Sequence, residues 1–138
     1  MGKLIIDKFI ICDDIRQETS GKLILIGVYP DDIIVVKNEF PYIHKSLSFF
    51  IMLHVDSVTN EEVKFTVVDP KGENVFDPNA IIELKNNKFS INASISNLRI
   101  ESAGEYMINI YVDNILDASL PFNVIQQLPE SNKSITTG

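Results

Sequence analysis

The sequence is poor in the residues on which several common classes of protein depend. A single cysteine excludes an internal disulfide framework, and no cluster of cysteine and histidine is present for a structural zinc. There is no tryptophan, and no apolar run approaches the roughly 20 residues that a membrane-spanning helix needs. Basic residues are outnumbered, with 12 Lys and Arg against 19 Asp and Glu. Because nucleic acids and anionic membranes require a basic face, we expect neither as a main partner.

What is present is typical of one globular domain. The chain has 138 residues, of which 45% are hydrophobic and 22% charged, so wholesale disorder is excluded. Asp7 and Lys8 interrupt the apolar N-terminal run and no small-residue cleavage site follows, so we expect a cytoplasmic protein without a signal peptide. Residues 1–126 are predicted to form the domain. Residues 127–138 are polar and lack periodicity, which predicts a flexible tail.

Alternation of apolar and polar residues with a period of two dominates the chain. It is clearest over residues 47–55, 89–96, 106–112 and 116–124, whereas helical periodicity is nowhere sustained. We therefore predict an all-β protein of about eight to nine antiparallel strands, arranged as a sandwich, with a barrel as the alternative. The segments 4–12, 23–29 and 33–36 are apolar on both faces. Such strands are either covered on both sides or lie at an edge that packs against a partner.

One motif distinguishes between sandwich and barrel. Residues 102–106, Ser-Ala-Gly-Glu-Tyr, follow an alternating strand and resemble the corner between strands E and F of immunoglobulin-like domains. In that corner the hydroxyl of the tyrosine, here Tyr106, bonds to backbone a few residues upstream, and Gly104 would permit a backbone approach that a side chain hinders. Ser102 replaces the usual Asp, and Ile108 replaces the cysteine of the family disulfide. The resemblance implies an immunoglobulin-like β-sandwich without a disulfide, with Gly104 and Tyr106 as its structural corner.

A second resemblance covers the N-terminal third. The similarity rests on the series Cys12-Asp13-Asp14 with Glu18, then Gly21-Lys22, then Gly27-Val28-Tyr29. This segment is similar to a family of small uncharacterised bacterial proteins, a domain of unknown function. This resemblance implies no activity and no cofactor.

Acidic residues gather in two segments that we expect to be loops. Carboxylates from meeting loops could supply oxygen ligands to a divalent cation, although no spacing matches a known calcium loop and nearby basic residues would compete. Alternatively, these residues form turns, or a recognition loop at the end of the sandwich. The candidate binding residues are Asp13, Asp14, Arg16, Glu18, Asp31 and Asp32.

No catalytic constellation is present in the sequence. Cys12 ends an apolar strand without an adjacent Lys or His, so a buried, inert thiol is expected. Phe50 and Met52 either belong to the core or form an apolar patch for a partner. We therefore expect a non-enzymatic protein-interaction module that binds itself or another protein through strand edges or end loops. The alternative is binding of a small ligand or divalent metal through the acidic loops.

Overall fold

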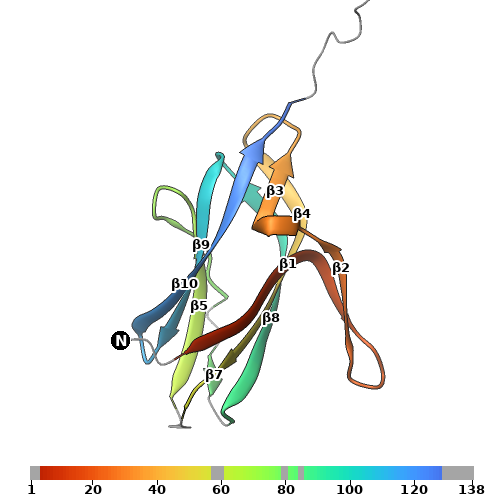
Figure 1. The fold of residues 1–138 in the computed structure, drawn as a ribbon. Helices are drawn as coiled ribbons and strands as arrows, with labels where there is room; N and C mark the ends of the chain where they lie inside the picture. Colours follow the sequence, from red (N-terminus) through yellow and green to blue (C-terminus); the bar gives the residue numbers. More distant parts are fainter. Residues whose placement is uncertain (1–3, 57–60, 79–80, 84–85, 129–138) are drawn as a thin grey trace, which may run out of the picture.

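The computed structural model describes residues 4–56, 61–78, 81–83 and 86–128, and it is all-β, as the two-residue periodicity predicts (Figure 1). A single 3-10 turn, η1 (Pro30–Asp32), accompanies the strands in this part of the chain, and no described helix is long and apolar enough to cross a membrane. The ten described strands are β1 (Ile5–Gln17), β2 (Leu23–Val28), β3 (Ile33–Val36), β4 (Tyr42–His54), β5 (Glu62–Val68), β6 (Asn74–Phe76), β7 (Ile82–Glu83), β8 (Lys88–Ile100), β9 (Gly104–Val112) and β10 (Ile115–Gln126).

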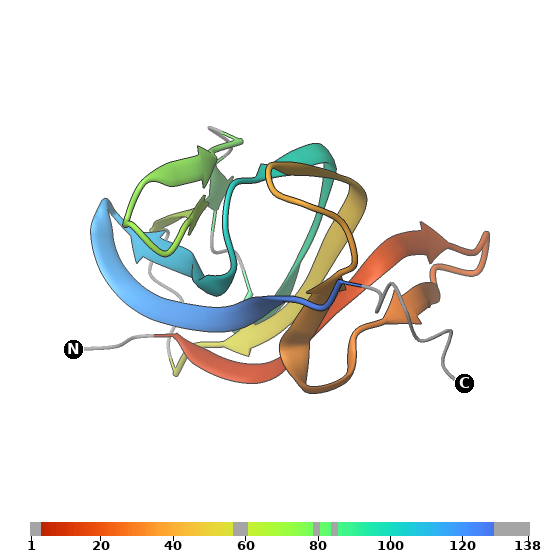
Figure 2. The ribbon, with the colours of Figure 1, turned by 90° about the horizontal axis from the view of Figure 1, so that it is seen from above.

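The strands form two sheets that face one another across a core (Figure 2). The first sheet has four strands in the order β2-β1-β4-β8, and all of its pairings are antiparallel. The second has the order β3-β10-β9-β5-β6, with β7 also pairing with β5. Its first strand, β3, runs parallel to β10. The molecule is therefore a β-sandwich in which β2 and β8 are the edges of one sheet.

The sandwich differs from the sequence prediction in three respects. The described part contains ten strands rather than eight or nine, and the pairing of β3 with β10 is parallel. The segment 13–17, which we expected to be a loop, is the second half of β1, because its partner β2 supplies a matching ladder. Of the predicted tail, residues 129–138 lie outside the described residues.

The core follows directly from the alternation. Leu47, Phe49 and Ile51 of β4 are fully buried, as are Ile108 and Ile110 of β9 in the facing sheet. Burial of one such side chain stabilises the fold by about 1.5–3 kcal/mol relative to leaving it exposed. With no disulfide, packing of these two faces stabilises the sandwich.

The corner between β8 and β9 is built around Tyr106. Its hydroxyl donates a hydrogen bond of 3.0 Å to the carbonyl oxygen of Ser102, and its buried ring stacks on Phe122 with ring centroids 5.4 Å apart. Gly104 has φ +137, and a Cβ there would lie 2.7 Å from Cγ of Pro70. A side chain at this position would therefore be strained and would collide with the turn after β5.

Candidate functional site

The second half of β1 leaves the body of the sandwich. From Ile5 to Cys12 the strand pairs with β4, but from Asp14 to Gln17 the described pairing is with β2 alone. The resulting two-stranded ribbon, residues 13–28, projects from the sandwich, and we call it the β1–β2 arm (Figures 1 and 2). A two-stranded hairpin by itself is marginally stable in water, so the contacts at its base determine its position.

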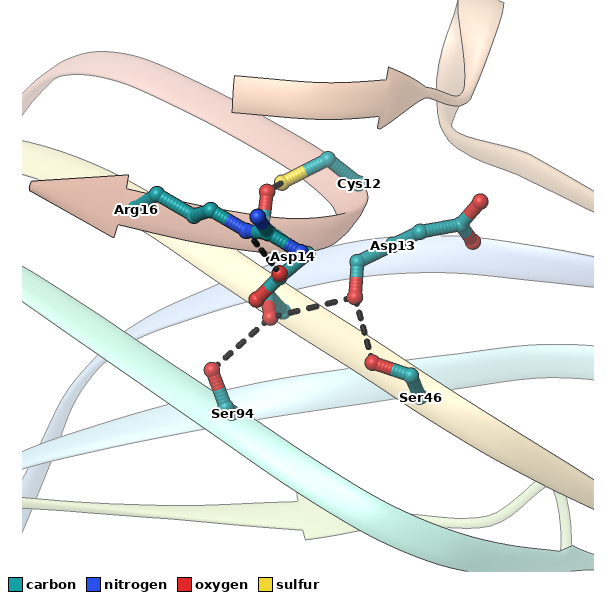
Figure 3. A network of polar contacts seen from close by, with 7 residues as sticks. Cys12, Asp13, Asp14, Arg16, Ser46 and Ser94 are labelled. Atoms are coloured by element: carbon teal, nitrogen blue, oxygen red, sulfur yellow. Dashed lines mark hydrogen bonds and ion pairs between the residues drawn. The ribbon is translucent and has the colours of Figure 1, made fainter. Parts of the chain in front are cut away.

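Serines of the neighbouring strands bind the backbone where the arm begins. Ser46 donates a hydrogen bond of 2.6 Å from its hydroxyl to the carbonyl oxygen of Asp13, and the hydroxyl of Ser48 lies 3.4 Å from the same oxygen (Figure 3). Ser48 is fully buried, and its Oγ lies 2.8 Å from Oγ of Ser94 on β8. These contacts satisfy the buried hydroxyl and anchor the backbone of β1 as it leaves β4.

The side chain of Asp13 joins a second polar cluster at the same place. The hydroxyl of Tyr29, just after β2, donates a hydrogen bond to the Asp13 carboxylate, and Nε2 of His44 lies 2.9 Å from the same phenolic oxygen. A phenol has one proton, which Asp13 accepts, so Nε2 of His44 is the donor to Tyr29. Nδ1 of His44 is then an acceptor; it is buried and has no hydrogen-bond partner among the described residues.

Burial changes the proton affinities of this cluster. It lowers the pKa of His44, with the Asp13 carboxylate opposing that effect, so the neutral imidazole is favoured. Burial and the hydrogen bond to Asp13 raise the pKa of Tyr29 well above its ordinary value, so the phenol stays protonated.

Gly27 has φ +71, and a Cβ there would run into the Asp13 carboxylate, so this position requires glycine. The cluster therefore attaches both strands of the arm to β4.

Cys12 is placed at the start of the arm. It is fully buried, and its Sγ lies 3.4 Å from the carbonyl oxygen of Asp14. Burial raises the pKa of the Cys12 thiol, and the carboxylates of Asp13 and Asp14 act in the same direction. The thiol is therefore neutral at physiological pH and a poor nucleophile.

The charged residues of the arm pair with one another on its surface. Nε of Arg16 lies 2.9 Å from the Asp14 carboxylate, and Nζ of Lys22 lies 3.8 Å from that of Glu18. All four side chains are substantially exposed, so each ion pair contributes about 0–1 kcal/mol.

Asp31 and Asp32 lie in η1, at the base of the arm. Both have positive φ, 59 and 55, and neither has an ion pair within the described residues. Burial raises the pKa of Asp32, and the adjacent Asp31 adds to the effect. The sequence-predicted carboxylates are not gathered into a metal site: the described part of the chain has no group of three or more His, Cys, Asp or Glu side chains that could bind an ion.

The outer strand of the arm carries a row of exposed aliphatic side chains. Ile24, Ile26 and Val28 alternate along β2 and are 42%, 40% and 50% exposed. β2 has no charged residue and is the edge of its sheet, so no described strand covers its outer side. Natural sheets usually protect such edges with charge, proline or a bulge. Phe50 and Met52, in contrast, are half-buried on β4.

The sequence predicted only some of the residues that form this site, and it expected them in loops. Asp13, Asp14 and Arg16 lie on β1 and Glu18 in the turn beyond it, rather than in an end loop. Tyr29 and the serines of β4 carry no local signal, because their contacts with Asp13 span 16 to 35 residues, and His44 contacts Tyr29 from 15 residues away. The apolar character of segment 23–29 on both faces was the available signal. It left open a strand covered on both sides or an edge strand, and the structure places β2 at an edge.

Comparison with known proteins identifies a family of unknown function. The sequence matches the family of unknown function DUF6941 over residues 7–125, and the chain therefore belongs to that family. This confirms the resemblance of the N-terminal segment to an uncharacterised domain family. No curated protein matches the sequence.

Among solved structures, the chain is similar to an alkylpurine DNA glycosylase from Pseudomonas fluorescens, AlkC, bound to DNA containing an abasic site analog. The identity is 10% and the TM-score 0.45, and the match covers 89% of this chain but only 30% of the glycosylase. A similarity of this size carries no functional argument.

Proposed function

We propose that this member of DUF6941 is a non-enzymatic protein-interaction module that binds another chain through the exposed edge of β2. The observation that carries the proposal is the row Ile24, Ile26 and Val28 on an uncharged edge strand of a projecting ribbon. An incoming strand would complete the hydrogen bonds of this edge and pack its own side chains beside the aliphatic row, which is the mode of binding known as strand addition.

The proposal includes an immunoglobulin-like architecture, which the strand order supports. In immunoglobulin domains strands B and E share one sheet, while C, F and G share the other. Here β4 and β8 share one sheet, while β5, β9 and β10 share the other. The hydroxyl of Tyr106 near the start of β9, bonded to backbone four residues upstream, has the geometry of the tyrosine corner.

The chemistry of the polar groups supports a role without catalysis. The Cys12 thiol is buried and neutral, and the hydroxyl of Tyr29 already donates to Asp13. Buried Cys12 has no access to substrate, and Tyr29, although its hydroxyl contacts Asp13 and His44, has a raised pKa and stays protonated, so neither group is an activated nucleophile. We place the module in the cytoplasm, where a lone thiol such as Cys12 remains reduced.

Site-specific photocrosslinking in cells tests the proposal. A photoreactive phenylalanine analogue at Val28 or Ile24 should give a covalent adduct of higher mass. The matched control is the same analogue at Asn123, which is exposed on the internal strand β10. Adducts at the β2 positions that disappear in an Ile26→Lys background support the proposal. Equal adducts at Asn123, or none at either β2 position, would overturn it.

A further inference from the structure

We infer that the chain that covers the edge of β2 is a second copy of this protein, paired antiparallel about a two-fold axis. This inference rests on the proposed function and names its partner. The resulting dimer would join the two four-stranded sheets into one continuous sheet of eight strands, with the two β2 strands at its centre. An interface of this kind is self-complementary, since each residue meets the copy of its own partner.

The periodicity of β2 matches this symmetry. When two identical strands pair about an axis perpendicular to the sheet, the axis passes midway between a residue and its own copy. The numbers of two opposite residues then differ by an even number. Because side chains alternate between faces along a strand, the two side chains lie on the same face of the sheet. Ile26 is the centre of the exposed row. With the axis there, Ile24 lies beside Val28 of the second copy and Ile26 beside its own copy, so the six aliphatic side chains pack against one another on one face of the sheet.

The charges at the two ends of β2 are complementary in the same register. Lys22 precedes the strand at the tip of the arm, and Asp31 and Asp32 follow it at the base. Antiparallel pairing centred on Ile26 directs Lys22 past Val28 of the second copy toward that copy's η1, which holds the acidic pair. Asp31 and Asp32 lack a cation within the described part of the chain, and Lys22 forms only a long, exposed contact with Glu18. Two such cross-dimer contacts would form, one at each end.

An engineered disulfide tests the register directly. Opposite residues of antiparallel strands have Cα atoms about 4.5–5.5 Å apart, which suits a disulfide. In a Cys12→Ser background, Ile26→Cys should oxidise within minutes to a covalent dimer of the full chain. Ile115→Cys, at a position that is 73% exposed but away from β2, is the matched control. Covalent dimer from both variants alike, or from neither, would overturn the inference.

Charge reversal tests the polarity of the pairing. By sedimentation equilibrium, the wild-type chain should dimerise, and Lys22→Glu and Asp31→Lys should each weaken dimerisation at least ten-fold. The double variant should recover most of that loss, whereas Lys88→Glu, on the opposite edge of the sheet, should have no effect. Asp31→Asn, which tolerates the left-handed backbone, should weaken dimerisation without straining η1. Failure of the double variant to recover would overturn the antiparallel register.

The two proposals fail separately. A wild-type chain that is monomeric at all concentrations, or a crosslink from Val28 to a different protein, would overturn the second-copy inference and leave β2 as a site for another partner. Absence of any crosslink at β2 would overturn the proposed function itself. Thermal unfolding of each variant distinguishes loss of pairing from loss of fold.

Discussion

Two tyrosines anchor two different regions of this molecule. Tyr106 is fully buried at the corner between β8 and β9, and its hydroxyl reaches the carbonyl oxygen of Ser102, four residues away. Tyr29 is half-buried at the base of the arm, and its hydroxyl connects Asp13 and His44, which are 16 and 15 residues away. The first bond stabilises the core, whereas the second positions a projecting edge strand. We therefore expect mutations at the corner to change global stability, and mutations at the arm to change local order and binding.

The largest effect is expected at Gly104 in the corner. Gly104→Ala should reduce the free energy of unfolding by about 2–4 kcal/mol, because it combines backbone strain with a collision against Pro70. Urea unfolding followed by circular dichroism measures this loss. Gly72→Ala is the control, since Gly72 also has positive φ but no atom lies within 4 Å of its added Cβ. Equal losses from the two variants would show that the close approach to Pro70 is unimportant.

The next effect concerns the hydroxyl of the corner itself. Tyr106→Phe keeps the stacked ring but leaves the Ser102 carbonyl without its donor, so the free energy of unfolding should fall by about 1–2 kcal/mol. The same urea titration measures it. Tyr111→Phe, on the outer face of β9, should change stability by less than about 0.5 kcal/mol. A Tyr106→Phe variant as stable as wild type would contradict the role of the corner.

The equivalent change in the arm should be smaller and local. Tyr29→Phe removes the hydroxyl between Asp13 and His44 and should cost about 0.5–1 kcal/mol. Amide hydrogen exchange should accelerate across residues 13–28 while β4 and β9 remain protected. Uniform acceleration over the whole sandwich would show that the arm and the core do not differ in this way.

The smallest effect is a dependence of stability on pH. Burial lowers the pKa of His44 in the folded state, so the unfolded chain binds more protons as the pH falls. The stability contributed by neutral His44 is therefore complete above the ordinary histidine pKa of 6.5 and decreases as the pH falls below it. Unfolding free energies at pH 7.5 and 5.5 should show this decrease in wild type and in His54→Gln. The decrease should be diminished in His44→Gln; an unchanged decrease there would contradict the assignment.

The corner could be predicted from sequence because its chemistry is local. Gly104 and Tyr106 are two residues apart, and the bond of Tyr106 spans only four. The alternation of Tyr106, Ile108, Ile110 and Val112 likewise identified a strand whose inner face is buried. A period of two is a property of the extended backbone, so it is visible before the partners of the strand are known.

The arm could not be predicted in the same way. Four of the five residues from Asp13 to Gln17 are polar or charged, and such a segment favours a loop when its partner strand is unknown. It extends β1 because β2 pairs with it, and that pairing moves Asp13 next to Tyr29. The serines of β4 and β8 then complete the base of the arm from segments more than 30 residues away.

The sequence by itself determined the all-β class, the apolar face of each strand with clear alternation, the absence of a disulfide and the family resemblance of the N-terminal third. Each of these depends on the order of neighbouring residues or on composition. Only the tertiary structure decided which apolar strand lies at an edge, where β1 leaves β4, and which acidic residue meets Tyr29 and His44. These features depend on contacts between segments far apart in the chain, and the period of a strand does not specify its neighbours.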